Sequence, residues 1–103
     1  MSNQHFTALK RDTYQITSPL TFDTVSDLLG LSAPWWAVPA ETVQIDLKSV
    51  PKADSAGLAL MVEWLQQARR AGRRLVFTNI PAKLQDLIRV SGLQDIFLNE
   101  KKW

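Results

Sequence analysis

The second half of the chain alternates short apolar runs with a helical segment, and this alternation constrains the fold more than any other feature. Residues 43–47 (VQIDL) and 75–77 (LVF) are rich in β-branched and apolar side chains, which predicts two strands. Between them, the apolar spacing predicts a helix from Ser55 to Ala71 that Gly72 ends. Because connections this short join parallel strands through a helix, the sequence predicts an α/β fold.

Further elements are predicted on both sides of this unit. Residues 81–92 predict a second helix that begins at Pro81 and stops at Gly92, and residues 96–98 (IFL) predict a last edge strand. Near the start, residues 6–10 and 13–16 alternate in polarity and predict a hairpin.

The segment between the hairpin and the first core strand is predicted to be short and partly helical. Thr21 or Asp23 is expected to cap a helix within residues 20–31, which Gly30 stops. Residues 34–39 (PWWAVP) are expected to form an apolar loop or short turn that covers the sheet. The expected architecture is one domain over residues 1–103, a mixed sheet with an antiparallel N-terminal hairpin, parallel core strands and helices packed on it.

The composition is typical of a folded, cytoplasmic protein. Hydrophobic residues make up 46% and charged residues 21%, and no apolar run approaches the roughly 18 residues of a membrane span. The first residues lack the apolar stretch of a signal peptide, and the absence of cysteine excludes disulfides and thiolate chemistry. The basic cluster of Arg69, Arg70, Arg73 and Arg74 falls at a predicted helix end, which favours a solvated helix terminus over a contact with nucleic acid or lipid phosphate.

The helix predicted from Ser55 to Ala71 carries apolar residues in two places. One stripe forms the expected core face, and it consists of Leu58, Met61, Val62, Leu65 and Ala68. Leu60 and Trp64 lie well outside this stripe, on the expected solvent side, where a Trp indicates an interface. Packing of Trp64 against the Trp35-Trp36 loop is the equally weighted alternative.

The mouth of this helix, Asp54-Ser55-Ala56-Gly57, combines a capping side chain with two very small residues. Asp54 or Ser55 can cap the first turn, while Ala56 and Gly57 leave its amides open to the backbone of a partner or to an anion. Capping combined with tight packing inside the domain is the alternative interpretation.

Catalysis and metal binding have little support in the sequence. A serine nucleophile needs a base, and the one histidine, His5, lies in an N-terminal segment that is expected to fray. The aspartates Asp23, Asp27, Asp46 and Asp54 fall on separate elements, and no glycine-rich phosphate loop followed by lysine occurs. We therefore expect no enzyme activity and no cofactor.

The order of these motifs resembles the STAS domain family. The likeness covers residues 43–98 and rests on VQIDL, ADSAGLALM, LVFTN and IPAKLQDLIRVSGL in that order. Within the family, LALMVEWLQQAR with its Glu63-Trp64 pair, together with FTNIPAKL, is most similar to MlaB-type domains. Those domains belong to ABC systems that move phospholipids between the two membranes of Gram-negative bacteria.

The resemblance implies a non-catalytic subunit, peripheral to an inner-membrane complex, that binds and stabilises the ABC ATPase of such a transporter. It implies that the contact is made by Ser55 and its helix, and the expected partner-binding residues are Asp54, Ser55, Ala56, Gly57, Leu60 and Trp64. No direct contact with nucleic acid and no membrane insertion are expected.

The family also contains a different functional class, the anti-sigma factor antagonists, in which the position of Ser55 is phosphorylated. The alternative function is therefore a transcriptional switch controlled by a phosphate on Ser55. Those antagonists usually carry a second serine where this chain has Ala56, and they usually lack the Glu63-Trp64 pair. Both features favour the transporter interpretation.

Overall fold

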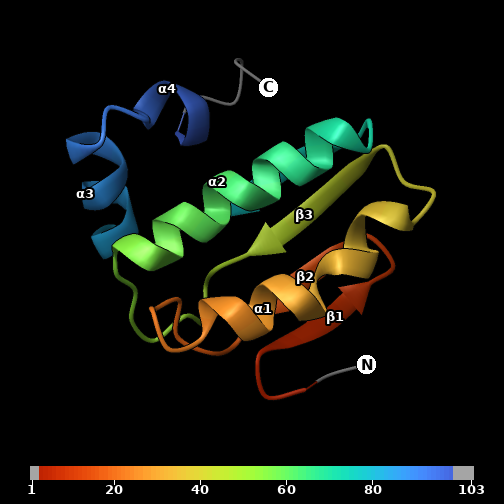
Figure 1. Ribbon diagram of the computed structural model, residues 1–103, viewed down its shortest axis with the longest axis horizontal. Helices are drawn as coiled ribbons and strands as arrows, with labels where there is room; N and C mark the ends of the chain where they lie inside the picture. Colours follow the sequence, from red (N-terminus) through yellow and green to blue (C-terminus); the bar gives the residue numbers. More distant parts are fainter. Residues whose placement is uncertain (1–2, 99–103) are drawn as a thin grey trace.

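The hairpin and the βαβ unit combine into one four-stranded sheet in the order β1-β2-β3-β4 (Figure 1). Strand β1 (Phe6–Lys10) pairs antiparallel with β2 (Thr13–Ile16), which runs parallel to β3 (Thr42–Asp46), and β3 runs parallel to β4 (Arg74–Thr78). The computed structural model describes residues 3–98. The predicted antiparallel hairpin and the parallel core are both confirmed.

The helices cover one face of this sheet. Helix α2 (Ser55–Arg70) connects β3 to β4 and contacts α1 (Val25–Leu31) on one side and α3 (Ala82–Val90) on the other (Figure 1). Along β3, Val43 and Ile45 are fully buried whereas Gln44 between them is exposed. This alternation is typical of a sheet with only one covered face.

The connection between α1 and β3 contains a short helix, where an apolar loop or short turn was predicted. Helix α1 continues through Gly30 to Leu31, and a short 3-10 helix, η1 (Ala33–Ala37), follows directly. The residue before α1 is Thr24 rather than the expected Thr21 or Asp23. Trp35 in η1 stacks on Tyr14 of β2 with ring centroids 4.2 Å apart, so the apolar segment covers the sheet as predicted.

The last predicted strand is wrong. Residues 94–97 form a short helix, α4 (Gln94–Phe97), after a turn in which Gly92 has a φ of 73°. The turn sends the chain back toward β4, and the Phe97 ring packs 5.6 Å from the ring of Phe77. Burial of Phe97 against the covered face replaces strand pairing at the sheet edge.

Helix α2 is buried over about half of its circumference, so the expectation that Leu60 and Trp64 face solvent is wrong. Leu60 is 4% exposed and Trp64 is fully buried. The buried residues form one continuous arc, and they are Gly57, Leu58, Leu60, Met61, Trp64, Leu65 and Ala68. The arc is wide because α2 packs on the sheet and has helices on two flanks, whereas a surface helix buries a single stripe.

Trp64 packs against the Trp35-Trp36 segment, which is the alternative that the sequence left open. The Trp64 indole N–H donates a hydrogen bond to the Ser32 hydroxyl at 2.8 Å, and its ring lies 5.5 Å from that of Trp35. This bond joins α2 to the residue between α1 and η1. Trp64 is therefore a central core residue of the domain.

Candidate functional site

The mouth of α2 is closed by Asp54, the residue that caps the helix. Its Oδ1 accepts hydrogen bonds from the backbone amides of Ala56 at 2.9 Å and Gly57 at 3.3 Å. These are the first-turn amides that the sequence suggested were open to a partner. The capping alternative is therefore confirmed for Asp54, and these two amides already have an acceptor within the domain.

Gly57 is small because another part of the same chain approaches it. A Cβ at this position would lie 2.3 Å from the backbone oxygen of Leu20, which no real side chain tolerates. Leu20 pairs with Ala53 in an isolated parallel bridge, and its carbonyl accepts a bond from the Asp54 amide at 3.1 Å. Gly57 is itself buried, so the structure does not place it on the surface.

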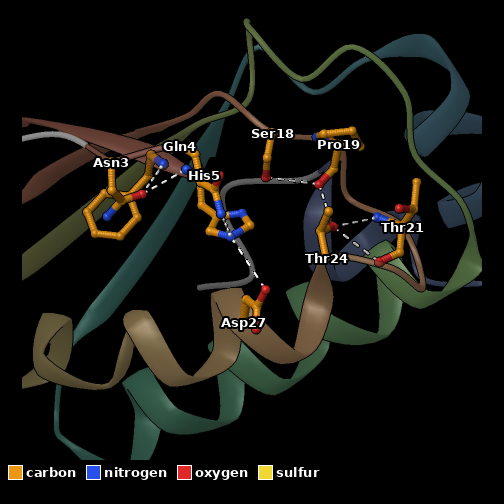
Figure 2. A network of polar contacts seen from close by, with 9 residues as sticks. Asn3, Gln4, His5, Ser18, Pro19, Thr21, Thr24 and Asp27 are labelled. Atoms are coloured by element: carbon orange, nitrogen blue, oxygen red, sulfur yellow. Dashed lines mark hydrogen bonds and ion pairs between the residues drawn. The ribbon is translucent and has the colours of Figure 1, made fainter.

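Asp54 also holds the turn that precedes α1. Its second carboxylate oxygen, Oδ2, accepts a hydrogen bond from the backbone amide of Phe22 at 3.2 Å. The same turn is fixed by Thr24, whose hydroxyl donates to the Pro19 carbonyl at 2.6 Å and accepts from the Thr21 amide at 3.1 Å (Figure 2). The backbone around Phe22 is thus tied both to the start of α1 and to the mouth of α2.

The side chain of Phe22 points into solvent from this fixed turn. It is 80% exposed, and within residues 3–98 no other aromatic side chain is exposed. Because several hydrogen bonds already hold the backbone here, less backbone entropy is lost when Phe22 is used as an anchor. Single exposed apolar residues are ordinary, so Phe22 by itself is not evidence of an interface.

A shallow apolar groove lies between α1 and α2. The groove has a volume of about 240 Å³, and it is lined by Val25, Ser26, Leu29, Ala56, Ala59, Leu60 and Glu63. Leu29 is 37% exposed at one wall, while the buried Leu60 lies beneath the small side chains of α2. The groove exists because Ala56 and Ala59 leave α2 without bulk on this side.

Ser55 and Ala59 are exposed on α2, one turn apart, and Ala56 beside them is partly buried. We define the α1–α2 face as Phe22, Val25, Leu29, Ser55, Ala56 and Ala59. Of the predicted partner-binding residues, Ser55 and Ala56 lie on this face, whereas Gly57, Leu60 and Trp64 are buried. The sequence analysis missed Phe22, Val25 and Leu29, because only the tertiary structure brings residues from about thirty positions earlier in the chain next to α2.

His5 is not available to Ser55 as a base. The ring is buried rather than frayed, and its Nε2 lies 3.6 Å from the Asp27 carboxylate on α1 (Figure 2). Among residues 3–98, no group of three His, Asp or Glu side chains is arranged to hold a metal ion. In the same part of the chain, no helix is both long enough and apolar enough to cross a bilayer.

The fold lowers the pKa of the Asp46 carboxyl group. Partial burial raises its pKa, but hydrogen bonds from the Asn79 side chain at 3.0 Å, the Lys48 amide at 2.9 Å and Gln15 at 3.4 Å outweigh this effect. The pKa of Asp46 therefore lies below its ordinary value. These bonds join the end of β3 to β2 and to the residue after β4, so we assign a stabilising role to Asp46.

Comparison with known proteins places this arrangement in a family. A family model described as "Mlab, STAS domain" matches residues 7–99, which is most of the chain. A search of curated protein sequences finds no match.

Several solved structures share the fold at low sequence identity. A Thermotoga maritima protein, provisionally assigned as an anti-sigma factor antagonist, is 14% identical with a TM-score of 0.72, over 92% of this chain and 87% of that one. The phosphorylated Bacillus cell-fate determinant SpoIIAA is 17% identical with a TM-score of 0.64, over 89% and 86%. A sulfate transporter family protein from Wolinella succinogenes is 17% identical with a TM-score of 0.64, over 82% and 68%.

Proposed function

The chain belongs to the STAS domain family, in the group described as Mlab, and on this premise we propose that it is a non-catalytic subunit of a phospholipid-transporting ABC system. In this proposal it resides in the cytoplasm, at the periphery of the inner-membrane complex. It binds the ABC ATPase subunit through the α1–α2 face and carries out no chemistry itself. The family match supports the kind of partner, and the exposed apolar surface beside Ser55 supports the place of contact.

The observation that carries the proposal is the concentration of exposed apolar groups around Ser55. Phe22 is 80% exposed and Leu29 is 37% exposed, and Leu29 also lines the apolar groove between α1 and α2. Interfaces commonly place an aromatic anchor beside a packed apolar centre. Ser55 adds a polar group at the edge of this surface.

Binding would support transport by stabilising the folded ATPase. A subunit that binds only the native state of its partner adds about 2.7 kcal/mol to the partner's stability when its concentration is about 100 times the Kd. This effect needs surface complementarity and no reactive group. It is consistent with a site built from alanine, serine and exposed apolar side chains.

The second candidate function is an anti-sigma factor antagonist that is switched by phosphorylation of Ser55. Ser55 is exposed at the first position of α2, where the helix dipole favours a phosphate. Against it stands Asp54, whose carboxylate already accepts bonds from the amides of Ala56 and Gly57. A phosphate on Ser55 would meet a like charge there instead of open amides.

Affinity purification distinguishes the two functions. The tagged chain is isolated from its host in mild detergent, and its partners and modifications are identified by mass spectrometry. Co-purification of an ABC ATPase with its permease supports the transporter role. Recovery of a serine-kinase anti-sigma factor instead, with a phosphate on Ser55, would refute it.

A matched pair of substitutions tests the place of contact. Phe22→Ala removes an exposed apolar side chain from the α1–α2 face, and Val90→Ala removes one, 87% exposed, from α3. Neither side chain is part of the core, so both variants should stay within about 0.5 kcal/mol of wild-type stability. We expect Phe22→Ala to weaken ATPase binding at least about tenfold and Val90→Ala to leave it unchanged. Equal effects of the two substitutions would place the contact elsewhere.

A further inference from the structure

A second cleft lies at the opposite end of α2, where the helix turns into β4. It has a volume of about 290 Å³, and it is lined by Glu41, Leu65, Arg69, Gly72, Arg73, Arg74 and Leu75. Three arginines and one glutamate line this cleft, so basic side chains outnumber acidic ones in its lining.

The backbone of this cleft is fixed by the turn that ends α2. The Arg73 amide donates to the Ala68 carbonyl at 2.8 Å, and the Gly72 amide donates to the Arg69 carbonyl at 3.0 Å. Gly72 has a φ of 72°, so the three features together make a Schellman motif. Arg74 begins β4 and donates from its amide to the Glu41 carbonyl at 2.9 Å. The cleft is therefore held by regular backbone hydrogen bonds.

The side chain of Arg73, which lines this cleft, has a hydrogen-bond donor with no acceptor among residues 3–98. Its Nε is buried and has no hydrogen-bond partner within residues 3–98. A buried donor without an acceptor is costly, and such groups in native proteins call for an explanation. The Nε–H and one terminal N–H of a guanidinium form the edge that binds two oxygens of a phosphate or carboxylate in parallel. An oxyanion in the cleft would supply the missing acceptor.

We propose that this cleft is a binding site for a phosphate group, held by the Nε edge of Arg73 with Arg69 and Arg74 contributing charge. A phosphate monoester carries about −1.5 to −2 charges at neutral pH, so it suits a cleft lined by several arginines better than a single carboxylate does. Glu41 lines the same cleft and opposes the anion, so it limits affinity. The group can come from a phospholipid headgroup or from a small soluble phosphate compound.

The site is tested on the isolated full chain by following backbone amide resonances during titration with inorganic phosphate. Chloride at the same ionic strength provides the reference. We expect saturable shifts at Gly72 and Leu75 that phosphate causes and chloride does not. Arg73→Gln should weaken binding about tenfold or more, because it removes charge-assisted hydrogen bonds. Arg11→Gln, which changes the charge equally at an exposed turn, should leave binding unchanged.

Two further variants distinguish binding through two parallel hydrogen bonds from the Arg73 guanidinium from simple charge attraction. Arg73→Lys keeps the positive charge but cannot offer two parallel donors, so it should bind phosphate almost as weakly as Arg73→Gln. Glu41→Gln should strengthen binding. The proposal is overturned if wild-type shifts do not saturate, if Arg11→Gln and Arg73→Gln weaken binding equally, or if Arg73→Lys binds like wild type.

Vesicles identify the source of the phosphate group. A lipid headgroup is indicated if the chain sediments with vesicles of phosphatidylcholine plus phosphatidate but not with phosphatidylcholine alone, and if inorganic phosphate reduces this sedimentation. Saturable phosphate binding with no vesicle binding would indicate a small soluble compound. Both outcomes support the site. Neither experiment involves the ATPase, so the result is independent of the proposed transporter role.

Discussion

Substitution of Gly57 by alanine separates two explanations for the small residues at the mouth of α2. The sequence alone suggested that Gly57 gives a partner room to approach, whereas the structure shows the chain's own Leu20 carbonyl in that space. An added Cβ would lie 2.3 Å from the Leu20 oxygen and 2.8 Å from the Leu20 Cβ. The two explanations predict different outcomes for stability.

The magnitude follows from what must move. The Leu20 oxygen accepts the Asp54 amide at 3.1 Å, and the Leu20 amide donates to Lys52 at 2.9 Å, so displacing it strains two hydrogen bonds. Overpacking of this kind costs about 1–3 kcal/mol, and each weakened hydrogen bond costs about 1 kcal/mol more. Alanine regains about 1 kcal/mol through its helix propensity. We expect a net loss of about 2–4 kcal/mol, which lowers Tm by at least about 8 °C for a domain of this size.

Gly30 provides the matched control. It also lies in a helix, but a Cβ there meets nothing within 4 Å. Gly30→Ala should therefore stabilise the domain by up to about 1 kcal/mol. Thermal and urea unfolding of both variants measure the difference. If Gly57→Ala melts at the wild-type temperature yet fails to bind the ATPase, the packing argument is wrong and Gly57 belongs to the contact surface.

Two further substitutions test the core and the sheet. Trp64→Phe removes the indole hydrogen bond to Ser32 and leaves a gap in the core, so urea unfolding should show a loss of stability of about 2 kcal/mol. Because Trp64 is fully buried, the folded variant should bind its partner with unchanged Kd. A selective loss of binding would instead identify Trp64 as a contact residue. Asp46→Asn should lower stability at neutral pH, because the lowered pKa of Asp46 contributes stability above its unfolded pKa of roughly 3.9. That contribution is lost as pH falls through the folded pKa, so urea unfolding should show the difference from wild type shrinking as the solution becomes strongly acidic. A constant difference would show that ionisation of Asp46 does not matter.

Local patterns were sufficient for most of the secondary structure. The strand at residues 43–47 and the helix from Ser55 were predicted to within one residue of β3 and α2, because each has an uninterrupted period and a clear boundary. Residues 96–98 failed because a three-residue apolar run has no period to distinguish strand from helix. The spacing of Leu93 and Phe97, four residues apart, is the signal that fits the observed helix.

The candidate site was half predictable. Ser55 and Ala56 were identified correctly as lying near a helix mouth, since capping motifs are local in sequence. Leu60 and Trp64 were misplaced because their exposure depends on elements about thirty residues away, including the hydrogen bond from Trp64 to Ser32. Phe22 was missed for the same reason, because its segment is brought to α2 by tertiary contacts, including the bond from its amide to Asp54.

The sequence by itself determined which residues form strands and helices, that two strands run parallel, and that the chain resembles the STAS family. These properties follow from periodicity, caps and motif order, which act over a few residues or a short crossover. Only the tertiary structure decided which side of α2 is solvent-exposed and that Gly57 accommodates Leu20. It also decided that the Nε of Arg73 is buried in the wall of a cleft lined by arginines. Exposure and close approach depend on which distant segments cover a helix, and a helical period carries no information about its neighbours.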